Sequence, residues 1–106
     1  MKLAAILTLT ALTGCAASMA EIDERPAGRQ FSSAKTGNAL VSCLVPAVSW
    51  MGVPAVAPDG EGRTRLTSDV SGVITLSMTV IDGNPSTIEI RTKVPDRLDR
   101  SVRSCI

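Results

Sequence analysis

The sequence contains no histidine and no tyrosine, and Phe31 and Trp50 are its only aromatic residues. Without histidine, the common nucleophile–base pairs of hydrolases and most zinc ligand sets cannot be assembled. The scarcity of aromatic rings also argues against surfaces that bind sugars or nucleic-acid bases by stacking. We therefore predict no catalytic site, no metal site and no cofactor, and we expect a non-enzymatic protein.

The sequence also lacks an excess of charge of either sign. Its 11 Lys and Arg residues nearly balance its 10 Asp and Glu residues, which gives a formal net charge of +1. A nucleic-acid-binding protein needs a concentrated basic surface, so we expect no nucleic-acid partner. Beyond the amino-terminal region, no apolar run is long enough to cross a membrane as a helix.

The amino-terminal stretch has the pattern of an export signal. Lys2 provides a positive start, and an apolar run from Leu3 to Leu12 follows, interrupted only by threonines. This run is too short for a membrane-spanning helix but fits the core of a secretory signal peptide. It ends in Leu12-Thr13-Gly14-Cys15, which resembles the lipobox of bacterial lipoproteins.

This resemblance implies an anchor rather than an activity. In lipoproteins the cysteine is diacylated and the signal is cut before it, so residues 1–14 would be removed and Cys15 would become the mature N-terminus. Two or three acyl chains hold a protein lastingly on a membrane, whereas one chain binds reversibly. Ala16 rather than aspartate follows the cysteine, and the resemblance then favours the periplasmic face of the outer membrane. The alternative is an ordinary signal peptide cut after Ala20.

The other two cysteines, Cys43 and Cys105, are an even pair in a chain that is built for export. Disulfides persist outside the cytosol, so we predict a bond between them, with two buried free thiols as the alternative. On the chain-entropy model, closing a loop of about 60 residues stabilises a fold by about 4 kcal/mol. Two thiolates alone would be an incomplete zinc site.

The composition changes between two parts of the mature chain. Residues 15–35 predict the lipidated cysteine and a flexible tether, because they lack a sustained apolar period. The charged cluster Glu21-Ile22-Asp23-Glu24-Arg25 is typical of a solvated linker, with a docking motif as the alternative. Residues 36–106 predict one small domain with a modest core.

The domain should begin and end with a helix. Thr36 or Asn38 can cap the first helix, which Pro46 should either kink or end near Val45. Asp96 can cap the last helix, whose narrow apolar stripe runs to Cys105. The arginines of this last helix predict a solvated face, with contact to anionic lipid headgroups as the alternative.

Between the helices, residues 63–67, 74–80 and 87–94 predict strands, the last two in a hairpin. In the strands 74–80 and 87–94 apolar and polar side chains alternate, so the sheet should bury one face. We therefore predict an α+β fold in the order α-β-β-β-α. Its three-stranded antiparallel sheet carries the N-terminal and the C-terminal helix on one face, and one disulfide joins them.

An extended apolar segment at residues 53–57 is the candidate partner surface. Pro54 and Pro58 confine this segment to a sheet edge. Trp50, Val53 and Val56 would then be available to a protein partner, and strand addition is one way to bind it.

We expect a membrane-anchored envelope lipoprotein that acts as a protein-interaction or structural module. The alternative is an inhibitor of a periplasmic enzyme or a small cell-wall-active protein. An exposed apolar patch would favour a binding partner, whereas a concave pocket with converging carboxylates would favour chemistry.

Overall fold

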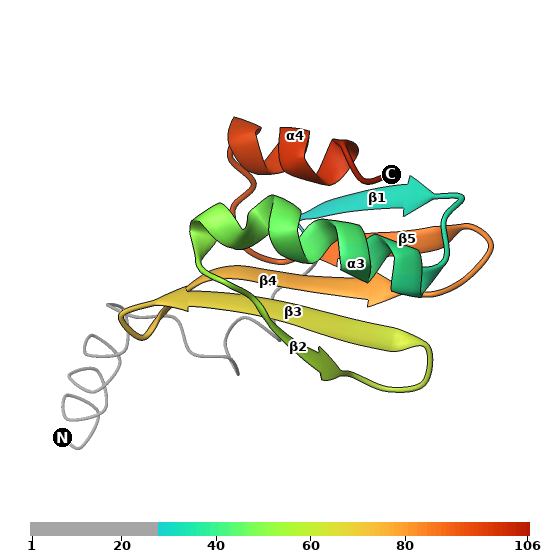
Figure 1. Ribbon diagram of the computed structural model, residues 1–106, viewed down its shortest axis with the longest axis horizontal. Helices are drawn as coiled ribbons and strands as arrows, with labels where there is room; N and C mark the ends of the chain where they lie inside the picture. The colour runs from blue at the N-terminus through green and yellow to red at the C-terminus, as the bar shows by residue number, and fades with distance from the viewer. Residues whose placement is uncertain (1–27) are drawn as a thin grey trace, which may run out of the picture.

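The computed structural model describes residues 28–106. These residues form an antiparallel five-stranded sheet and two helices that pack on one of its faces (Figure 1). The order of strands in the sheet is β1-β5-β4-β3-β2, which places β1 and β2 at its edges. In chain order the elements are β1 (Arg29–Ser33), α3 (Gly37–Val48), the 3-10 helix η2 (Ser49–Met51), β2 (Ala55–Pro58), β3 (Arg63–Val70), β4 (Val73–Ile81), β5 (Ser86–Ile90) and α4 (Asp96–Arg103).

The α+β class and the two helices on one face are confirmed, but the prediction of three strands is wrong. The sheet also contains β2 and β1, and β1 lies in the range that was expected to be a tether. This strand contains a single large apolar residue, Phe31, which lies opposite Ile88 of β5. Such a strand has no apolar period of its own, and it forms because β5 offers it a backbone ladder and a buried position.

The core lies between the helices and the inner face of the sheet. Residues that face each other across neighbouring strands are buried together, as Leu66, Met78 and Ile90 show. The helices contribute an inner stripe each, because apolar residues recur every three to four positions. The buried apolar residues are Phe31, Leu40, Leu44, Val48, Leu66, Leu76, Met78, Val80, Ile88, Ile90, Leu98, Val102 and Cys105.

The first helix begins as predicted and ends later than predicted. Thr36 is the N-cap, and its Oγ1 accepts a hydrogen bond from the backbone N–H of Ala39 (3.2 Å). The helix does not end near Val45 but runs to Val48, with Pro46 inside its last turn. Pro46 has no backbone N–H, so the helix lacks the hydrogen bond that residue 46 would otherwise donate to the carbonyl oxygen of Ser42. The last carbonyl groups of a helix also lack intrahelical partners, and the hydroxyl of Ser49 donates to one of them, the carbonyl oxygen of Val45 (2.6 Å).

The β4–β5 hairpin is confirmed, with Ile81 opposite Thr87. The prediction that its second strand runs to residue 94 is wrong, because β5 ends at Ile90. Beyond this point the backbone N–H of Ser77 donates to the side-chain hydroxyl of Thr92 (3.2 Å), so a side chain replaces the next partner in the ladder. The prediction that Asp96 caps α4 is also wrong, since α4 begins at Asp96 and Pro95 holds the N-cap position.

The predicted disulfide is confirmed. Cys43 of α3 is bonded to Cys105, which follows α4, and their Cα atoms are 5.7 Å apart. The bond therefore joins the two helices of the outer layer. Within residues 28–106, no helix has the length and apolar character needed to cross a membrane.

Candidate functional site

The structure separates Trp50 from the two valines of the predicted partner surface, Val53 and Val56. Trp50 lies in η2, where its ring Nε1–H donates to the hydroxyl of Ser101 in α4 (3.2 Å). The guanidinium carbon of Arg97 lies 4.2 Å from the centroid of the indole ring. Although 38 % of Trp50 is exposed, its polar edge and one ring face are engaged with α4. Trp50 therefore packs against α4 and does not belong to the apolar surface near β2.

Val53, the first of the two valines near β2, is 79 % exposed and is held in place by the segment before it. The carbonyl oxygen of Gly52 accepts a hydrogen bond from Ser68 Oγ (2.7 Å), and that of Met51 accepts one from Thr75 Oγ1 (2.9 Å). Gly52 has a φ of +109°, and a Cβ atom there would lie 3.0 Å from the carbonyl oxygen of Asp69. Only glycine fits this position without strain, so the chain leaves α3 in one defined direction.

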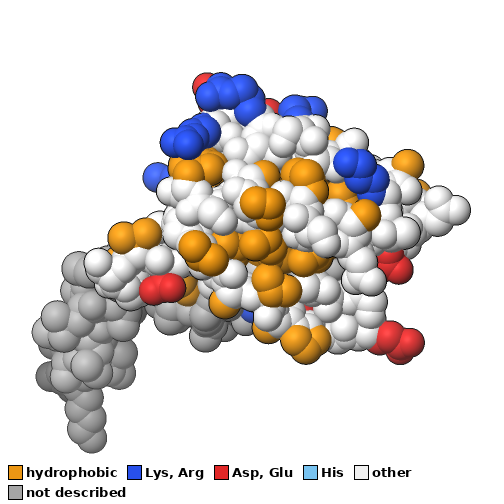
Figure 2. Space-filling view, in the orientation of Figure 1, with side chains coloured by type: hydrophobic (Ala, Val, Ile, Leu, Met, Phe, Trp, Pro, Cys, Tyr) orange, Lys and Arg blue, Asp and Glu red, His pale blue; other side chains and the backbone are white. Residues whose placement is uncertain are grey.

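Val56, the second valine, is 50 % exposed and lies opposite the fully buried Leu66 of β3. Its side chain therefore points to the helix side of the sheet. On α3, Val41 and Val45 are partly buried, on the side of the helix that points away from the disulfide-bonded Cys43. Figure 2 shows hydrophobic side chains gathered over α3 and toward β2, and basic side chains over α4. We call Val41, Val45, Val53 and Val56 the β2 surface.

The backbone of β2 is poorly suited to strand addition. The N–H of Asp59 donates to the carbonyl oxygen of Arg63 (3.0 Å). Backbone groups alternate in direction along an antiparallel strand, so Pro54, Val56 and Pro58 are the residues directed outward. Two of these three residues have no N–H to donate. A partner can therefore bind this edge through apolar side chains much better than through an added backbone ladder.

Two exposed apolar residues near this surface were not expected from the sequence. Val70 and Val73 face each other across the β3–β4 hairpin, and about half of each residue is exposed. Val70 follows Asp69, against which Gly52 packs, so the hairpin end lies beside the start of the β2 segment. The signal in the sequence was the pair of valines that flanks Ser71-Gly72, since apolar residues are unusual next to an exposed turn.

A cavity of about 510 Å³ lies at the N-terminal end of α3. Asp82 is its single acidic lining residue, and Asp82 Oδ1 accepts a hydrogen bond from the backbone N–H of Gly37 (2.7 Å). This carboxylate therefore fixes the start of the helix. Converging carboxylates, the feature expected of a chemical site, are not found among the residues that line this cavity. Its walls include Thr36, Asn38, Pro58, Gly60, Arg63 and Thr64.

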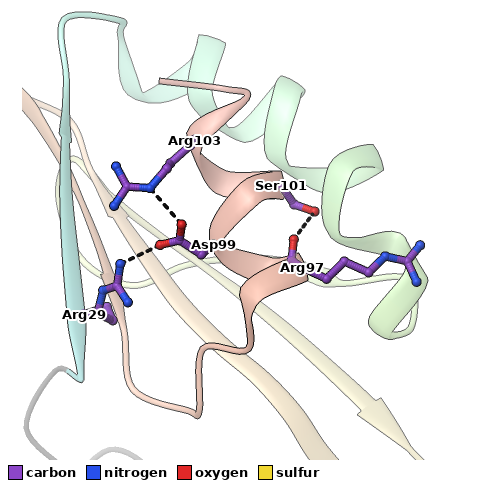
Figure 3. A network of polar contacts seen from close by, with 5 residues as sticks. All are labelled: Arg29, Arg97, Asp99, Ser101 and Arg103. Atoms are coloured by element: carbon purple, nitrogen blue, oxygen red, sulfur yellow. Dashed lines mark hydrogen bonds and ion pairs between the residues drawn. The ribbon is translucent and has the colours of Figure 1, made fainter.

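The arginines of α4 form part of a network that ties the helix to β1 (Figure 3). Asp99 accepts hydrogen bonds from Arg103 Nε (2.8 Å) and from Arg29 in β1. The hydrogen bond from Arg103, together with the positive charges of Arg103 and Arg29, lowers the pKa of Asp99 below 3.8. Both guanidinium groups also lie over the ring of Phe31. These arginines thus have structural roles beyond a solvated helix face.

Cys15, the predicted lipidation site, lies outside the described residues. Between residues 28 and 106, no group of three or more Cys, Asp or Glu side chains is placed to hold a metal ion. No protein-family model matches this sequence, and no curated protein and no solved structure matches it either. The proposals below are therefore based on the residues and contacts of this chain.

Proposed function

We propose that the protein is a lipid-anchored lipoprotein of the bacterial cell envelope whose domain binds a protein partner through the β2 surface. The observation that carries the proposal is Leu12-Thr13-Gly14-Cys15 at the end of an export signal. Cys15 would carry the acyl chains, and the mature chain would start there. The favoured location is the periplasmic face of the outer membrane.

The cysteine pairing supports an anchored, exported protein. The chain has three cysteines, and Cys43 and Cys105 are bonded to each other. Cys15 is then the cysteine left for lipid attachment. A disulfide between two helices also suits a compartment outside the cytosol, where such bonds persist.

The apolar character of the β2 surface supports a protein partner. Val53 and Val56 are at least half exposed, and Val41 and Val45 adjoin the core. Exposed apolar side chains of this kind are common at protein-interaction sites. Because the outward backbone positions include two prolines, we expect the partner to insert apolar side chains between α3 and β2.

The anchor can be tested by intact mass and membrane fractionation of the full chain expressed in a bacterial host. The wild type should gain the mass of its acyl chains and stay with the membrane, and Cys15→Ala should lose both properties. The matched control, Cys43→Ser with Cys105→Ser, should keep the lipid mass. A soluble wild-type product cut after Ala20 would contradict the anchor and make an inhibitor of a periplasmic enzyme the better hypothesis.

The partner surface can be tested by placing a photo-crosslinking amino acid at Val56 in cells. As a matched control, the same amino acid is placed at Asn84, in the β4–β5 turn. A protein that crosslinks at Val56, fails to crosslink at Asn84 and is lost when Val53→Lys is added would support the proposal. Equal crosslinking at both positions, or no change with Val53→Lys, would contradict it.

A further inference from the structure

The sheet has a second face, which α3 and α4 do not cover (Figure 1). Arg65, Thr79 and Glu89 lie opposite one another on β3, β4 and β5, and Gln30 of β1 extends the row. Because their neighbours Leu66 and Met78 point into the core, these side chains point to the other side. The open face is the surface formed by Gln30, Arg65, Thr67, Ser77, Thr79, Glu89 and Arg91.

The residues at the centre of the open face are more deeply buried than is usual for a sheet face that no helix covers. One face of an antiparallel sheet is commonly solvated, yet Thr79 is fully buried and Ser77 is 2 % exposed. Thr79 Oγ1 has no hydrogen-bond partner among residues 28–106. A buried hydroxyl without a partner costs about 1–3 kcal/mol, so a hydrogen-bond acceptor that covers this position would stabilise the fold.

The charged residues beside Thr79 indicate which chemical groups would bind over it. The side chains of Arg65 and Arg91 are 20 % and 19 % exposed. Arg65 Nη2 is 3.2 Å from Asp59 Oδ2, and Arg91 Nη2 is 3.9 Å from Glu89 Oε1. A guanidinium group presents five N–H donors in a planar fork whose geometry matches a carboxylate, so this part of the face suits acidic side chains. A segment with several carboxylates therefore suits the open face.

A segment with this chemistry precedes β1 in the same chain. Glu21-Ile22-Asp23-Glu24 places three carboxylates within four residues, whereas residues 28–106 contain nine Lys and Arg against seven Asp and Glu. We call these four residues the acidic segment. Its charge is opposite to that of the domain, and Pro26 separates it from β1 at a point where the chain can turn.

The acidic segment is close enough to reach Thr79. The backbone N–H of Gly28 donates to the carbonyl oxygen of Ile90 (2.8 Å), which fixes the chain at the edge formed by β1 and β5. Gly28 is four positions after Glu24, and an extended chain spans about 3.3–3.6 Å per position, or about 14 Å in all. Neighbouring strands are about 4.8 Å apart, so β4 lies about 10 Å from β1.

We propose that the acidic segment lies across the open face, where its carboxylates bind Arg65 and Arg91 and accept the hydroxyl hydrogen of Thr79. The chain between the lipid and the domain then shortens from residues 15–27 to about residues 15–20, which holds the domain close to its membrane. The open face is closed by this contact, and the β2 surface stays available on the opposite side. The contact itself does not depend on lipid attachment.

Carbodiimide crosslinking of an Arg65→Lys variant tests this contact. The variant also carries Cys15→Ala, so no acyl chain is attached, and both possible cleavage sites leave Glu21 in the protein. The reagent condenses the new amine with a nearby carboxylate to an amide, with loss of water. A link to Asp59 is expected in every case and reports that the reaction works. A further link to the acidic segment, found by peptide mass spectrometry, is the expected result.

Two controls decide between the possible occupants of the open face. Arg100→Lys, on the outer side of α4, should give no link to the acidic segment. An equal mixture of unlabelled and ¹⁵N-labelled chains shows whether links form within one molecule, as we expect. Links with mixed labels would show that a second copy covers the face and would overturn the proposal. A link to Asp59 without any link to the acidic segment would also overturn it.

Thr79→Val provides an independent test. The change in melting temperature should have opposite signs depending on whether the Thr79 hydroxyl has a hydrogen-bond partner. The substitution keeps the shape of the side chain and removes its hydroxyl. If the acidic segment accepts a hydrogen bond from that hydroxyl, Thr79→Val should lower the melting temperature, and the loss should disappear when Glu21→Ala, Asp23→Ala and Glu24→Ala are also present. If the hydroxyl has no partner, Thr79→Val should raise the melting temperature, which would overturn the proposal.

Discussion

Cys43 in α3 and Cys105 after α4 are bonded, although 62 residues separate them in the sequence. Four of the five strands, β2 to β5, lie between the two cysteines in the chain. Cys105 is fully buried among core residues, so the bond is part of the packing between the helices. For a domain of this size, such a link is a large share of the total stability.

Removing the bond should therefore destabilise the domain strongly. For a loop of this length, we expect Cys43→Ser with Cys105→Ser to lower the free energy of unfolding by about 4 kcal/mol. Urea denaturation followed by circular dichroism measures this change. The wild type in reductant should lose a similar amount, and Cys15→Ala in oxidising buffer should lose none. An unchanged midpoint in reductant would contradict the structural role of the bond.

The assignment of residues 29–33 to the sheet leads to a second prediction. Phe31 is buried opposite Ile88, whereas the neighbouring Gln30 is exposed. Phe31→Ala should cost about 3–5 kcal/mol, as expected for a large side chain removed from a core. Gln30→Ala is the matched control and should cost less than about 1 kcal/mol. If both variants unfold at the wild-type urea concentration, these residues belong to a tether after all.

Gly52 should tolerate substitution less well than a glycine in open space. A methyl group at Gly52 would lie 3.0 Å from a backbone oxygen, whereas one at Gly62 meets nothing within 4 Å. Gly62 has a φ of +69°, close to the left-handed helical region, where alanine costs about 1–2 kcal/mol, whereas Gly52 has a φ of +109° and a ψ of +134°, outside that region. Gly52→Ala should lower the melting temperature more than Gly62→Ala does, and it should weaken crosslinking from Val56. Equal melting temperatures would show that the chain can shift away from Asp69.

We expect the stability of the protein to depend on pH in the acidic range, through the protonation of Asp99. Its folded-state pKa is lowered below 3.8 by the hydrogen bond and charge of Arg103 and by the charge of Arg29. The stabilisation is therefore present above the unfolded-state pKa and is lost as the pH falls through the lower, folded-state value. Asp99→Asn should melt at a lower temperature than the wild type at pH 7, and the difference should shrink as the pH falls through the lowered pKa of Asp99.

Glu61→Gln is the control for this pH series, because Glu61 is an exposed residue of the β2–β3 turn. Melting curves of the three proteins between pH 7 and pH 2 provide the comparison. We expect Glu61→Gln to follow the wild type throughout. A constant difference between Asp99→Asn and the wild type at every pH would show that the carboxylate charge is not what stabilises the α4–β1 contact.

Features that depend on neighbouring residues in the chain could be predicted from the sequence. The alternation of residues 74–80 predicted β4, and the turn at Asp82-Gly83-Asn84-Pro85 predicted its hairpin with β5. The hydroxyl of Thr36 at the start of an apolar helix predicted the cap. Each of these signals lies within a few residues of the structure that it specifies, so no knowledge of the fold was needed.

The candidate site was predictable only in part. The exposure of Val53 and Val56 followed from an apolar segment confined to an edge by prolines. The position of Trp50 did not follow, because its contacts with Arg97 and Ser101 depend on how α4 packs beside α3. The direction in which each proline faces also depends on the register of β2 against β3.

The sequence by itself contains the export pattern that ends in Cys15, and it predicted the pairing of Cys43 with Cys105 and the α+β class, because these depend on composition, cysteine number and local periodicity. Only the tertiary structure decided that Phe31 lies in an additional strand, that β5 ends at Ile90, and that Thr79 is buried on a face without helices. These features come from contacts between segments far apart in the chain. A single apolar side chain or hydroxyl becomes buried only when a distant segment supplies its partner.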